Sequence, residues 1–334
     1  MNFLHASINV YTTKIGEMQM YQIGFDVGGT NIAVGLVDDN MRIIQRSNIK
    51  FPFGKKYDFV SQIMANEARD LLINNGIKEN HVSGIGVAVP GSIDSSGEII
   101  IDAFKLGFHN VPFKKSIQSH FPNLPVYMAN DADAATLAEL HAGALKGCKT
   151  ALLITLGTGV GGGIIINGQI FKGGMGNGVE LGHMILNHKG DVCSCGNIGC
   201  VETLCAATWL IQQGRKAIVE HFNSMIYTEA KGNIENVTAQ LVIDCARAGD
   251  SIAINIFEQY IDALSSVIVS FINLIDPEVI AIGGGVSLAG DFLFSNLRKK
   301  VTEKSVYKTY AKIVPAQLGN DAGIIGAAML HRNF

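Results

Sequence analysis

The sequence contains little proline, a single tryptophan and no block of five or more basic residues. Seven of its 334 residues are Pro, against 38 Gly, and 48% of the residues are hydrophobic. This composition excludes a collagen-like or intrinsically disordered chain. The formal net charge of -3, together with the lack of a Lys/Arg block, argues against nucleic acid or an anionic membrane as the main partner. A small molecule is the expected ligand.

The chain also lacks the sequence signals of export and of membrane insertion. The first twenty residues contain no basic segment followed by an unbroken apolar stretch, which a secretory signal would have. The most hydrophobic helix candidate, between Ala263 and Ile275, is shorter than the roughly 20 residues that cross a membrane. We therefore predict a cytoplasmic protein in which this stretch is a buried core helix.

Two parts of the chain share one pattern of strands and glycine-rich turns. Residues 21–49 predict three strands joined by tight turns, and residues 151–170 repeat the order of strand, Gly-rich turn and strand. Helical periodicity marks residues 57–75 and 251–275. The length suggests two domains. The sequence therefore predicts an α/β fold with a cleft between two similar halves.

Three glycine-rich turns each follow an apolar strand. They are Asp26–Asn31 (DVGGTN), Gly157–Gly163 (GTGVGGG) and Gly283–Gly285 (GGG). Glycine permits positive φ and lets backbone N–H groups approach a polyanion, so three such turns predict a phosphate site. Neither the dinucleotide fingerprint nor the P-loop pattern is present. Any one turn alone is better explained as a tight hairpin.

The first of these turns begins with an acidic residue. Asp26 ends a predicted strand, where its carboxylate can hold Mg²⁺ through water while Thr30 meets a phosphate. The alternative is an ordinary aspartate that forms the turn.

Six cysteines occur, and three of them crowd into eight positions. Cys193, Cys195 and Cys200 follow His183 closely in the chain. Three thiolates and one imidazole satisfy a closed tetrahedral zinc site. Because no coordination position stays open, such a zinc would be structural, and its binding would be coupled to ordering of the loop 183–200. Free cysteines near a turn are the alternative.

Seven segments together resemble the ROK family of sugar kinases and sugar-responsive repressors. They are FDVGGTNIAVGLVD, GVAVPGSID, NDADAATLAEL, ITLGTGVGGGIIINGQI, ELGHM, CSCGNIGCVE and IGGGVS, in this order over residues 21–330. The resemblance implies the two-lobed α/β fold of actin, hexokinase and the heat-shock ATPases, which is ribonuclease H-like, here with a zinc-binding loop. It also implies a kinase that uses ATP with Mg²⁺, and a homodimer.

The resemblance further implies how the chain is divided. Residues 1–20 would be an N-terminal extension, and residues 21–125 a small lobe that a C-terminal helix at about 320–334 completes. Residues 126–319 would be the large lobe, which carries the zinc loop. No Pro-rich or Ser-rich linker separates the two, which favours a hinge of ordinary secondary structure.

Asn130 and Asp131 open an Ala-rich helix over residues 132–145. On the residues alone, either is an ordinary helix N-cap. The resemblance implies that Asp131 is the general base that takes the proton from the attacking sugar hydroxyl, and that Asn130 orients the sugar. Phosphoryl transfer requires mostly positioning plus one such carboxylate. Asp133 is the nearest competitor, and we assign it to the helix dipole.

The resemblance assigns further residues to each ligand. Sugar contacts are implied for Gly91, Asn130, Asp131, Glu180, His183 and Glu202. ATP contacts are implied for Asp26, Gly28, Gly29, Thr30, Asn31, Thr158, Gly159, Gly283, Gly284 and Gly285. The zinc ligands would be His183, Cys193, Cys195 and Cys200, so His183 would serve metal and sugar with one ring nitrogen each. Plain turns and solvated surface glutamates are the alternatives.

The choice of sugar and the class of function keep alternatives. Glucose-directed members of the family often carry an Asn and a nearby Trp in the segment that reads Lys105–Phe108 (KLGF) here. N-acetylmannosamine or N-acetylglucosamine is therefore an alternative to glucose. A non-catalytic sugar-responsive regulator is disfavoured because about twenty residues before the first strand are too few for a DNA-binding domain. A chaperone or filament ATPase of the same superfamily is a third alternative, and it is disfavoured because a zinc site beside two carboxylates would have no role in such a protein.

Overall fold

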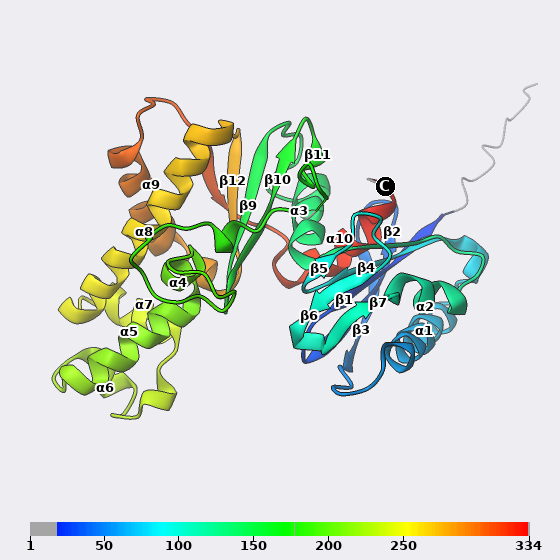
Figure 1. Cartoon of the computed structure of the whole chain (residues 1–334), viewed down its shortest axis with the longest axis horizontal. Coiled ribbons are helices and arrows are strands. Elements are labelled where there is room, and N and C mark those ends of the chain that lie inside the picture. The colour runs from blue at the N-terminus through cyan, green and yellow to red at the C-terminus, as the bar shows by residue number, and fades with distance from the viewer. Residues whose placement is uncertain (1–18, 177, 333–334) are drawn as a thin grey trace, which may run out of the picture.

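The computed structural model describes residues 19–176 and 178–332. Figure 1 shows two lobes, each built on one five-stranded sheet. The first sheet comprises β1 (Tyr21–Val27), β2 (Asn31–Asp38), β3 (Ile43–Lys50), β4 (Val82–Val89) and β8 (Val126–Asn130). The second comprises β9 (Ala151–Leu156), β10 (Val160–Ile166), β11 (Gln169–Ile170), β12 (Val279–Gly283) and β13 (Lys312–Pro315). The predicted N-terminal extension lies almost wholly outside the described residues.

The two sheets have the same topology. Their strand orders are β3-β2-β1-β4-β8 and β11-β10-β9-β12-β13. In each sheet the first three strands in chain order are antiparallel neighbours, and the remaining two strands run parallel to the central one. The repeat of strand and glycine-rich turn in the sequence is therefore a repeat of structure, and the two-lobed fold that the motifs imply is confirmed.

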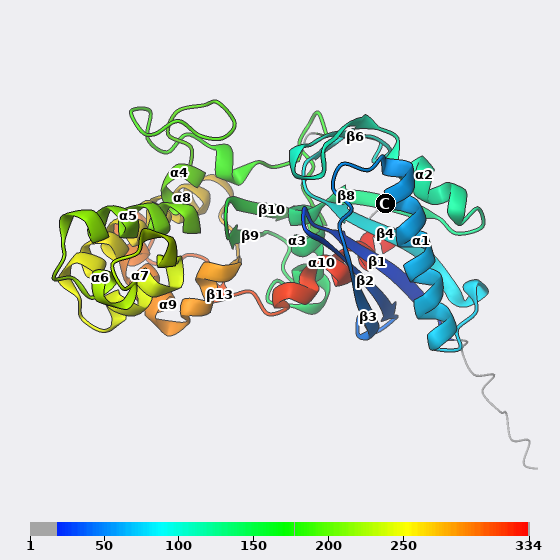
Figure 2. The same cartoon turned by 90° about the horizontal axis from the view of Figure 1, so that it is seen from below.

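Helices cover both sheets. They are α1 (Tyr57–Asn74), α2 (Phe113–His120), α3 (Asp131–Ala142), α4 (Glu202–Cys205), α5 (Ala207–Glu220), α6 (Met225–Glu229), α7 (Ala239–Arg247), α8 (Ser251–Ile275), α9 (Asp291–Lys304) and α10 (Ala322–Met329). Figures 1 and 2 show α1 and α2 beside the first sheet, α8 and α9 beside the second, and α3 with α10 between the lobes. A small third sheet of β5 (Ser92–Ile93), β6 (Ile100–Ala103) and β7 (Phe108–Val111) joins the first lobe.

By length and composition, α8 is the one helix in the described part of the chain that could cross a membrane. Half of the residues in its most hydrophobic 18-residue stretch are buried inside the protein. Tyr260, Leu264 and Ile268 on this helix belong to the largest hydrophobic cluster, beneath the second sheet. The helix thus packs as the buried core helix that the sequence predicts.

Glycines let α10 lie directly on the backbone of the first sheet. The strand β1 alternates, so Ile23, Phe25 and Val27 enter the core with α1 while Gly24 faces the other side. A side chain at Gly24 or Gly86 would overlap a carbonyl oxygen of α10. The last described helix is therefore held against a sheet formed by residues at the other end of the chain.

This close approach predicts a large loss of stability from a small substitution. In Gly86→Ala, the added methyl group would overlap the Ala327 carbonyl oxygen. Because the clash is with backbone atoms of a packed helix, it can be relieved only by moving the helix or the strand. We expect a loss of about 1–3 kcal/mol in the free energy of unfolding, measured by urea denaturation. The control is Gly174→Ala, whose added methyl group meets no atom within 4 Å. Equal stability of the two variants would contradict this packing.

Candidate active site

The start of α3 fixes the two residues for which the sequence predicts the chemistry. The side chain of Asn130 accepts a hydrogen bond from the Ala132 N–H at 2.8 Å, which makes it the helix N-cap. Its Nδ2 donates to the Gly91 carbonyl oxygen at 2.9 Å. Asp131 Oδ1 accepts from the same Ala132 N–H at 2.9 Å. Asn130 is therefore the helix N-cap that the sequence offers as its structural role. The same two contacts also fix the orientation of its amide.

Asp131 lies at the centre of a group of carboxylates. Burial within the surrounding protein raises the pKa of Asp131, although the hydrogen bond from Ala132 and the positive charge of Lys105 oppose this shift. Burial first, and then the charge of Asp131 among other charges, raise the pKa values of Asp26, Asp133 and Glu180. A carboxylate with a raised pKa accepts a proton more readily at neutral pH.

A polar pocket opens beside this group. Its cavity of about 60 Å³ is lined by Gly91 and Asn130, which follow and end strands of the first sheet, and by Lys172 and Glu180, which follow the β11 strand of the second. Asp133, in the first turn of α3, lines it too. Burial raises the pKa of Glu180, and the neighbouring His183 opposes that shift. The pocket thus gathers three of the residues that the resemblance assigns to the sugar.

Asp133 provides a test of the electrostatics of the pocket. Burial first, and then the charges of Glu180 and Asp131, raise its pKa from 3.8 to about 6, against the opposing charge of Lys172. A raised pKa favours the folded state at low pH, and this contribution disappears as the pH rises through 6. We therefore expect the free energy of unfolding of Asp133→Asn, relative to that of the wild-type protein, to increase by about 1–2 kcal/mol as the pH rises from 4.5 to 8. This range is discounted for the partial exposure of the side chain.

The measurement is urea unfolding of the ligand-free protein across this pH range. Ser92→Ala in the same pocket is the control, because it removes no titrating group. A stability difference between Asp133→Asn and the wild-type protein that does not change with pH would contradict the burial of this carboxyl group.

The first glycine-rich turn joins β1 to β2 and is a hairpin by its hydrogen bonds. The Gly28 N–H donates to the Asn31 carbonyl oxygen at 2.8 Å, and Thr30 and Asn31 are exposed. At its start, burial and the charge of Asp131 raise the pKa of Asp26 to about 6. Asp26 lies against Gly323 of α10, where any side chain would displace it. Hairpin geometry and a phosphate site are therefore compatible at this turn.

The second and third turns lie side by side. Gly284 has φ of 81° and packs on the backbone of Leu156, the residue just before Gly157. The next residue, Gly285, begins a short 3-10 helix. Thr158 accepts a hydrogen bond from the Thr208 hydroxyl at 3.2 Å through its carbonyl oxygen. Glycine is required at position 284 because both its dihedral angle and its contact exclude a Cβ atom.

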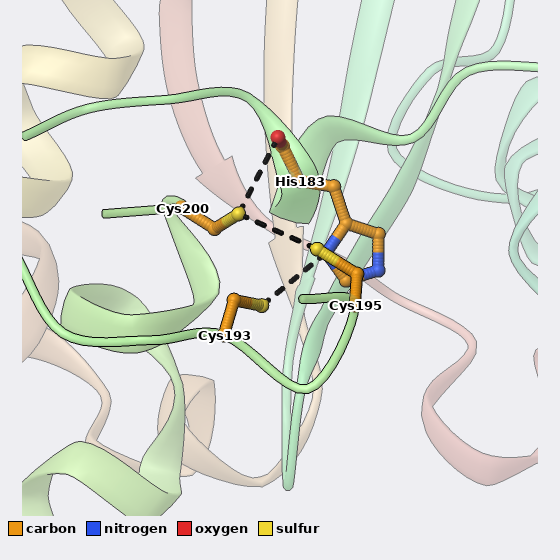
Figure 3. A group of neighbouring side chains, drawn as sticks. All are labelled: His183, Cys193, Cys195 and Cys200. Carbon is orange, nitrogen blue, oxygen red and sulfur yellow. Dashed lines mark hydrogen bonds between the residues drawn. The ribbon is translucent and has the colours of Figure 1, made fainter. Parts of the chain in front are cut away.

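The cysteine cluster is assembled as the spacing predicts. Figure 3 shows His183, Cys193, Cys195 and Cys200 pointing toward one another, and their ligand atoms all lie within 4.8 Å of each other. Cys193 Sγ is 3.6 Å from His183 Nδ1, and Cys195 Sγ is 3.7 Å from Cys200 Sγ. Zn–S bonds of about 2.3 Å give tetrahedral edges of about 3.8 Å, so this donor set fits zinc.

Glu202 connects the cysteine loop to the second glycine-rich turn. Its Oε2 accepts a hydrogen bond from the Val160 N–H at 3.1 Å, while its Oε1 accepts one from the Ser194 hydroxyl at 3.1 Å. A Cβ atom at Gly159 would overlap the same carboxylate. Both oxygens of Glu202 therefore already hold protein groups, a role that the sequence does not indicate.

The structure adds two residues to the site that the sequence argument leaves out. Asp133 is assigned to the helix dipole by its position, yet it lines the pocket as well. Lys172 lines the pocket and its charge faces Asp133. The spacing of Asp131 and Asp133 within NDAD is the only local signal for the first, and Lys172 has none, because it lies far from Asp133 in the chain.

Comparison with known proteins gives the family. Residues 22–333 match the ROK family. A glucokinase from Thermotoga maritima is 35% identical over 316 residues, which cover 92% of this chain and 96% of the glucokinase. This chain belongs to the ROK family. An N-acetylmannosamine kinase from Citrobacter koseri is 30% identical over 312 residues, which cover 93% of this chain and 98% of that kinase.

A solved structure gives the same assignment. The crystal structure of a ROK family glucokinase from Streptomyces griseus in complex with glucose and AMPPNP has a TM-score of 0.76 and 28% identity. The match covers 94% of this chain and 100% of that one. In the ROK protein described here, Gly91, Asn130 and Glu180 line one pocket, whereas His183 and Glu202 belong to the cysteine loop and its border. Their contacts with a sugar stay predictions.

Proposed function

We propose that this ROK protein transfers the γ-phosphoryl group of ATP to a hydroxyl of a hexose, with Asp131 as the general base. The observation that carries the proposal is the place of Asp131. It opens α3 beside Asn130, and its charge acts on Asp26 at the first glycine-rich turn and on Glu180 in the pocket. Asp131 does not itself line the pocket, but its influence on both sides supports a role between the phosphates and the sugar.

The kinase class itself follows from the relatives. The chain is an ATP-dependent sugar kinase, because it belongs to the ROK family and matches glucokinases and an N-acetylmannosamine kinase over nearly its whole length. The role of Asp131, the metals and the identity of the sugar are the parts that we propose.

The residues suggest one sequence of events. The amide of Asn130, held by Gly91 and Ala132, would orient the sugar so that its hydroxyl faces Asp131. Asp131 would take the hydroxyl proton as the sugar oxygen attacks the γ-phosphorus, and the bond from that phosphorus to the bridging oxygen of ADP would break. The glycine-rich turns would direct backbone N–H groups at the phosphates of the nucleotide.

Two metal ions fit residues of this chain. Asp26, at the head of the first turn, offers carboxylate oxygens to Mg²⁺, which when bound would neutralise phosphate charge. The cluster of His183 with Cys193, Cys195 and Cys200 offers a closed donor set to zinc, which would fix the loop that carries His183. The His183 ring would then be oriented by one nitrogen, leaving the other for a sugar hydroxyl.

Glucose is the first substrate that we propose, and an N-acetylhexosamine is the second. Glucokinases of 34–35% identity support glucose. The kinase from Citrobacter koseri supports N-acetylmannosamine, and the KLGF segment departs from the pattern of glucose-directed members. A non-catalytic sugar-responsive regulator is the competing function, and it would have no need of a proton-accepting carboxylate beside a phosphate-type turn.

We also propose that the protein acts in the cytoplasm as a homodimer. Its lobes would be residues 21–125, completed by the C-terminal helix at about 320–334, and residues 126–319, although β8 at the start of the second range pairs with β4 in the sheet of the first lobe. The packing of α10 on Gly24 and Gly86 supports the assignment of that helix to the first lobe.

The experiment is an assay of the purified protein with ATP, Mg²⁺ and single sugars. The sugars are glucose, mannose, N-acetylglucosamine and N-acetylmannosamine, and formation of ADP is followed together with ³¹P detection of the sugar phosphate. We expect one sugar to be phosphorylated with a kcat of about 1–100 s⁻¹. Sugar binding by calorimetry without phosphorylation of any of them would favour the regulator and overturn the proposed function.

A further inference from the structure

The three glycine-rich turns contain no lysine or arginine. Many enzymes that transfer a phosphoryl group place a lysine beside the terminal phosphates, because charge develops on the three equatorial oxygens of the transferred group. A lysine ammonium is a compact charge with three donors that suits this position. In this chain a cationic side chain in that position would come from a segment outside the turns.

Lys105 approaches the first turn from the small third sheet. A Cβ atom at Gly29 would lie 3.2 Å from Lys105 Cβ and 3.3 Å from the Lys105 carbonyl oxygen. Gly29 therefore allows the root of the lysine to pack against the turn. The side chain itself is exposed, and its positive charge opposes the rise that burial gives to the pKa of Asp131. The backbone and Cβ of Lys105 thus lie at the phosphate-type turn, while its charge reaches the proposed base.

The segment that carries Lys105 is anchored in the core of the first lobe. The buried side chains of Leu106 and Phe108 flank it, and the Phe108 ring packs on Phe51 with 6.1 Å between ring centroids. The Phe51 N–H donates to the carbonyl oxygen of Thr30 in the first turn at 2.8 Å. The lysine backbone and the turn therefore pack into one unit, which holds the root of the lysine beside the turn.

We infer that Lys105 binds the γ-phosphoryl group of ATP and holds it during transfer toward the hydroxyl that faces Asp131. This inference rests on the proposed kinase function. Lys105 exchanges no proton: the sugar oxygen forms its bond to the γ-phosphorus, Asp131 takes the proton, and ADP leaves with the electrons of the broken bond. The packing on Gly29 favours this role over recognition of the sugar, because it ties the lysine to the phosphate side.

The first test is binding, which needs no turnover. By calorimetry with Mg²⁺, Lys105→Met should weaken the binding of AMPPNP about tenfold and leave the binding of ADP within twofold, because only the analogue offers a γ-phosphate. Lys105→Arg should restore most of the loss. Lys115→Met, which removes an exposed lysine of α2, is the matched control. Equal loss for AMPPNP and ADP, or no loss, would overturn the inference.

The second test is kinetic. Lys105→Met should lower kcat about 10²- to 10³-fold, as expected for one group that stabilises developing charge, while the dissociation constant of the sugar alone changes less than threefold. A weaker sugar affinity with unchanged kcat would assign Lys105 to the sugar and overturn the inference. If the wild-type protein phosphorylates no hexose, the proposed function fails, whereas the comparison of AMPPNP with ADP still decides the contact with the γ-phosphate.

Discussion

Asp131→Asn should lower kcat about 10²- to 10⁴-fold while the affinity for the sugar changes only a few fold. Asparagine retains the size of the side chain and a hydrogen-bond acceptor for the Ala132 N–H, which Asp131 Oδ1 engages at 2.9 Å. It cannot take the proton of the attacking hydroxyl. The expected signature is therefore a fall in kcat with little change in the dissociation constant of the sugar.

The measurements are steady-state kinetics and sugar calorimetry on the same preparation. Asp70→Asn, on an exposed position of α1, is the matched control and should keep full activity. The raised pKa of Asp131 further predicts that the acid limb of kcat/KM lies above the pH expected for an ordinary aspartate. Turnover of Asp131→Asn within threefold of the wild-type value would contradict the role of general base.

Cys200→Ser should remove zinc from the protein and weaken sugar binding together. The Cys200 side chain is buried and its Sγ lies 3.7 Å from Cys195 Sγ, so no solvent ligand can replace it easily. Without the ion, the loop loses the group that fixes His183, and the bridge from Ser194 through Glu202 to Val160 loses its support. We expect a rise of about 10- to 100-fold in the KM for the sugar.

The measurements are metal content by mass spectrometry and KM for the sugar. Cys148→Ser is the control, because Cys148 lies outside the cluster. The wild-type protein and the control should each hold one zinc ion per chain. A Cys200→Ser protein that holds no zinc and keeps its full activity and sugar affinity would show that the metal has no part in the sugar pocket.

The sequence predicts the repeated halves of the fold because the information is local. A strand, a glycine-rich turn and a second strand read directly as β1 with β2 and as β9 with β10. The cysteine cluster is predicted for a similar reason, since its three cysteines lie within eight positions and His183 is close by in the chain. In both cases the residues that meet in space are also near neighbours in sequence.

Contacts between distant segments are what the sequence does not predict. Gly24 and Gly86 look like ordinary members of apolar strands, and only the arrival of α10 from the far end of the chain explains why they have no side chain. The same holds for Lys172 facing Asp133, and for Lys105 packing on Gly29. The local pattern of each segment carries no sign of its partner, so the electrostatics of the pocket emerge only in the folded chain.

The most direct measurement of the central claim is a crystal structure of the protein with the sugar that it phosphorylates and AMPPNP. We expect one carboxylate oxygen of Asp131 within about 2.6–3.2 Å of a sugar hydroxyl. That hydroxyl should also lie in line with the γ-phosphorus and its bridging atom. An Asp131 side chain that contacts neither the sugar nor its reacting hydroxyl in this complex would contradict the account.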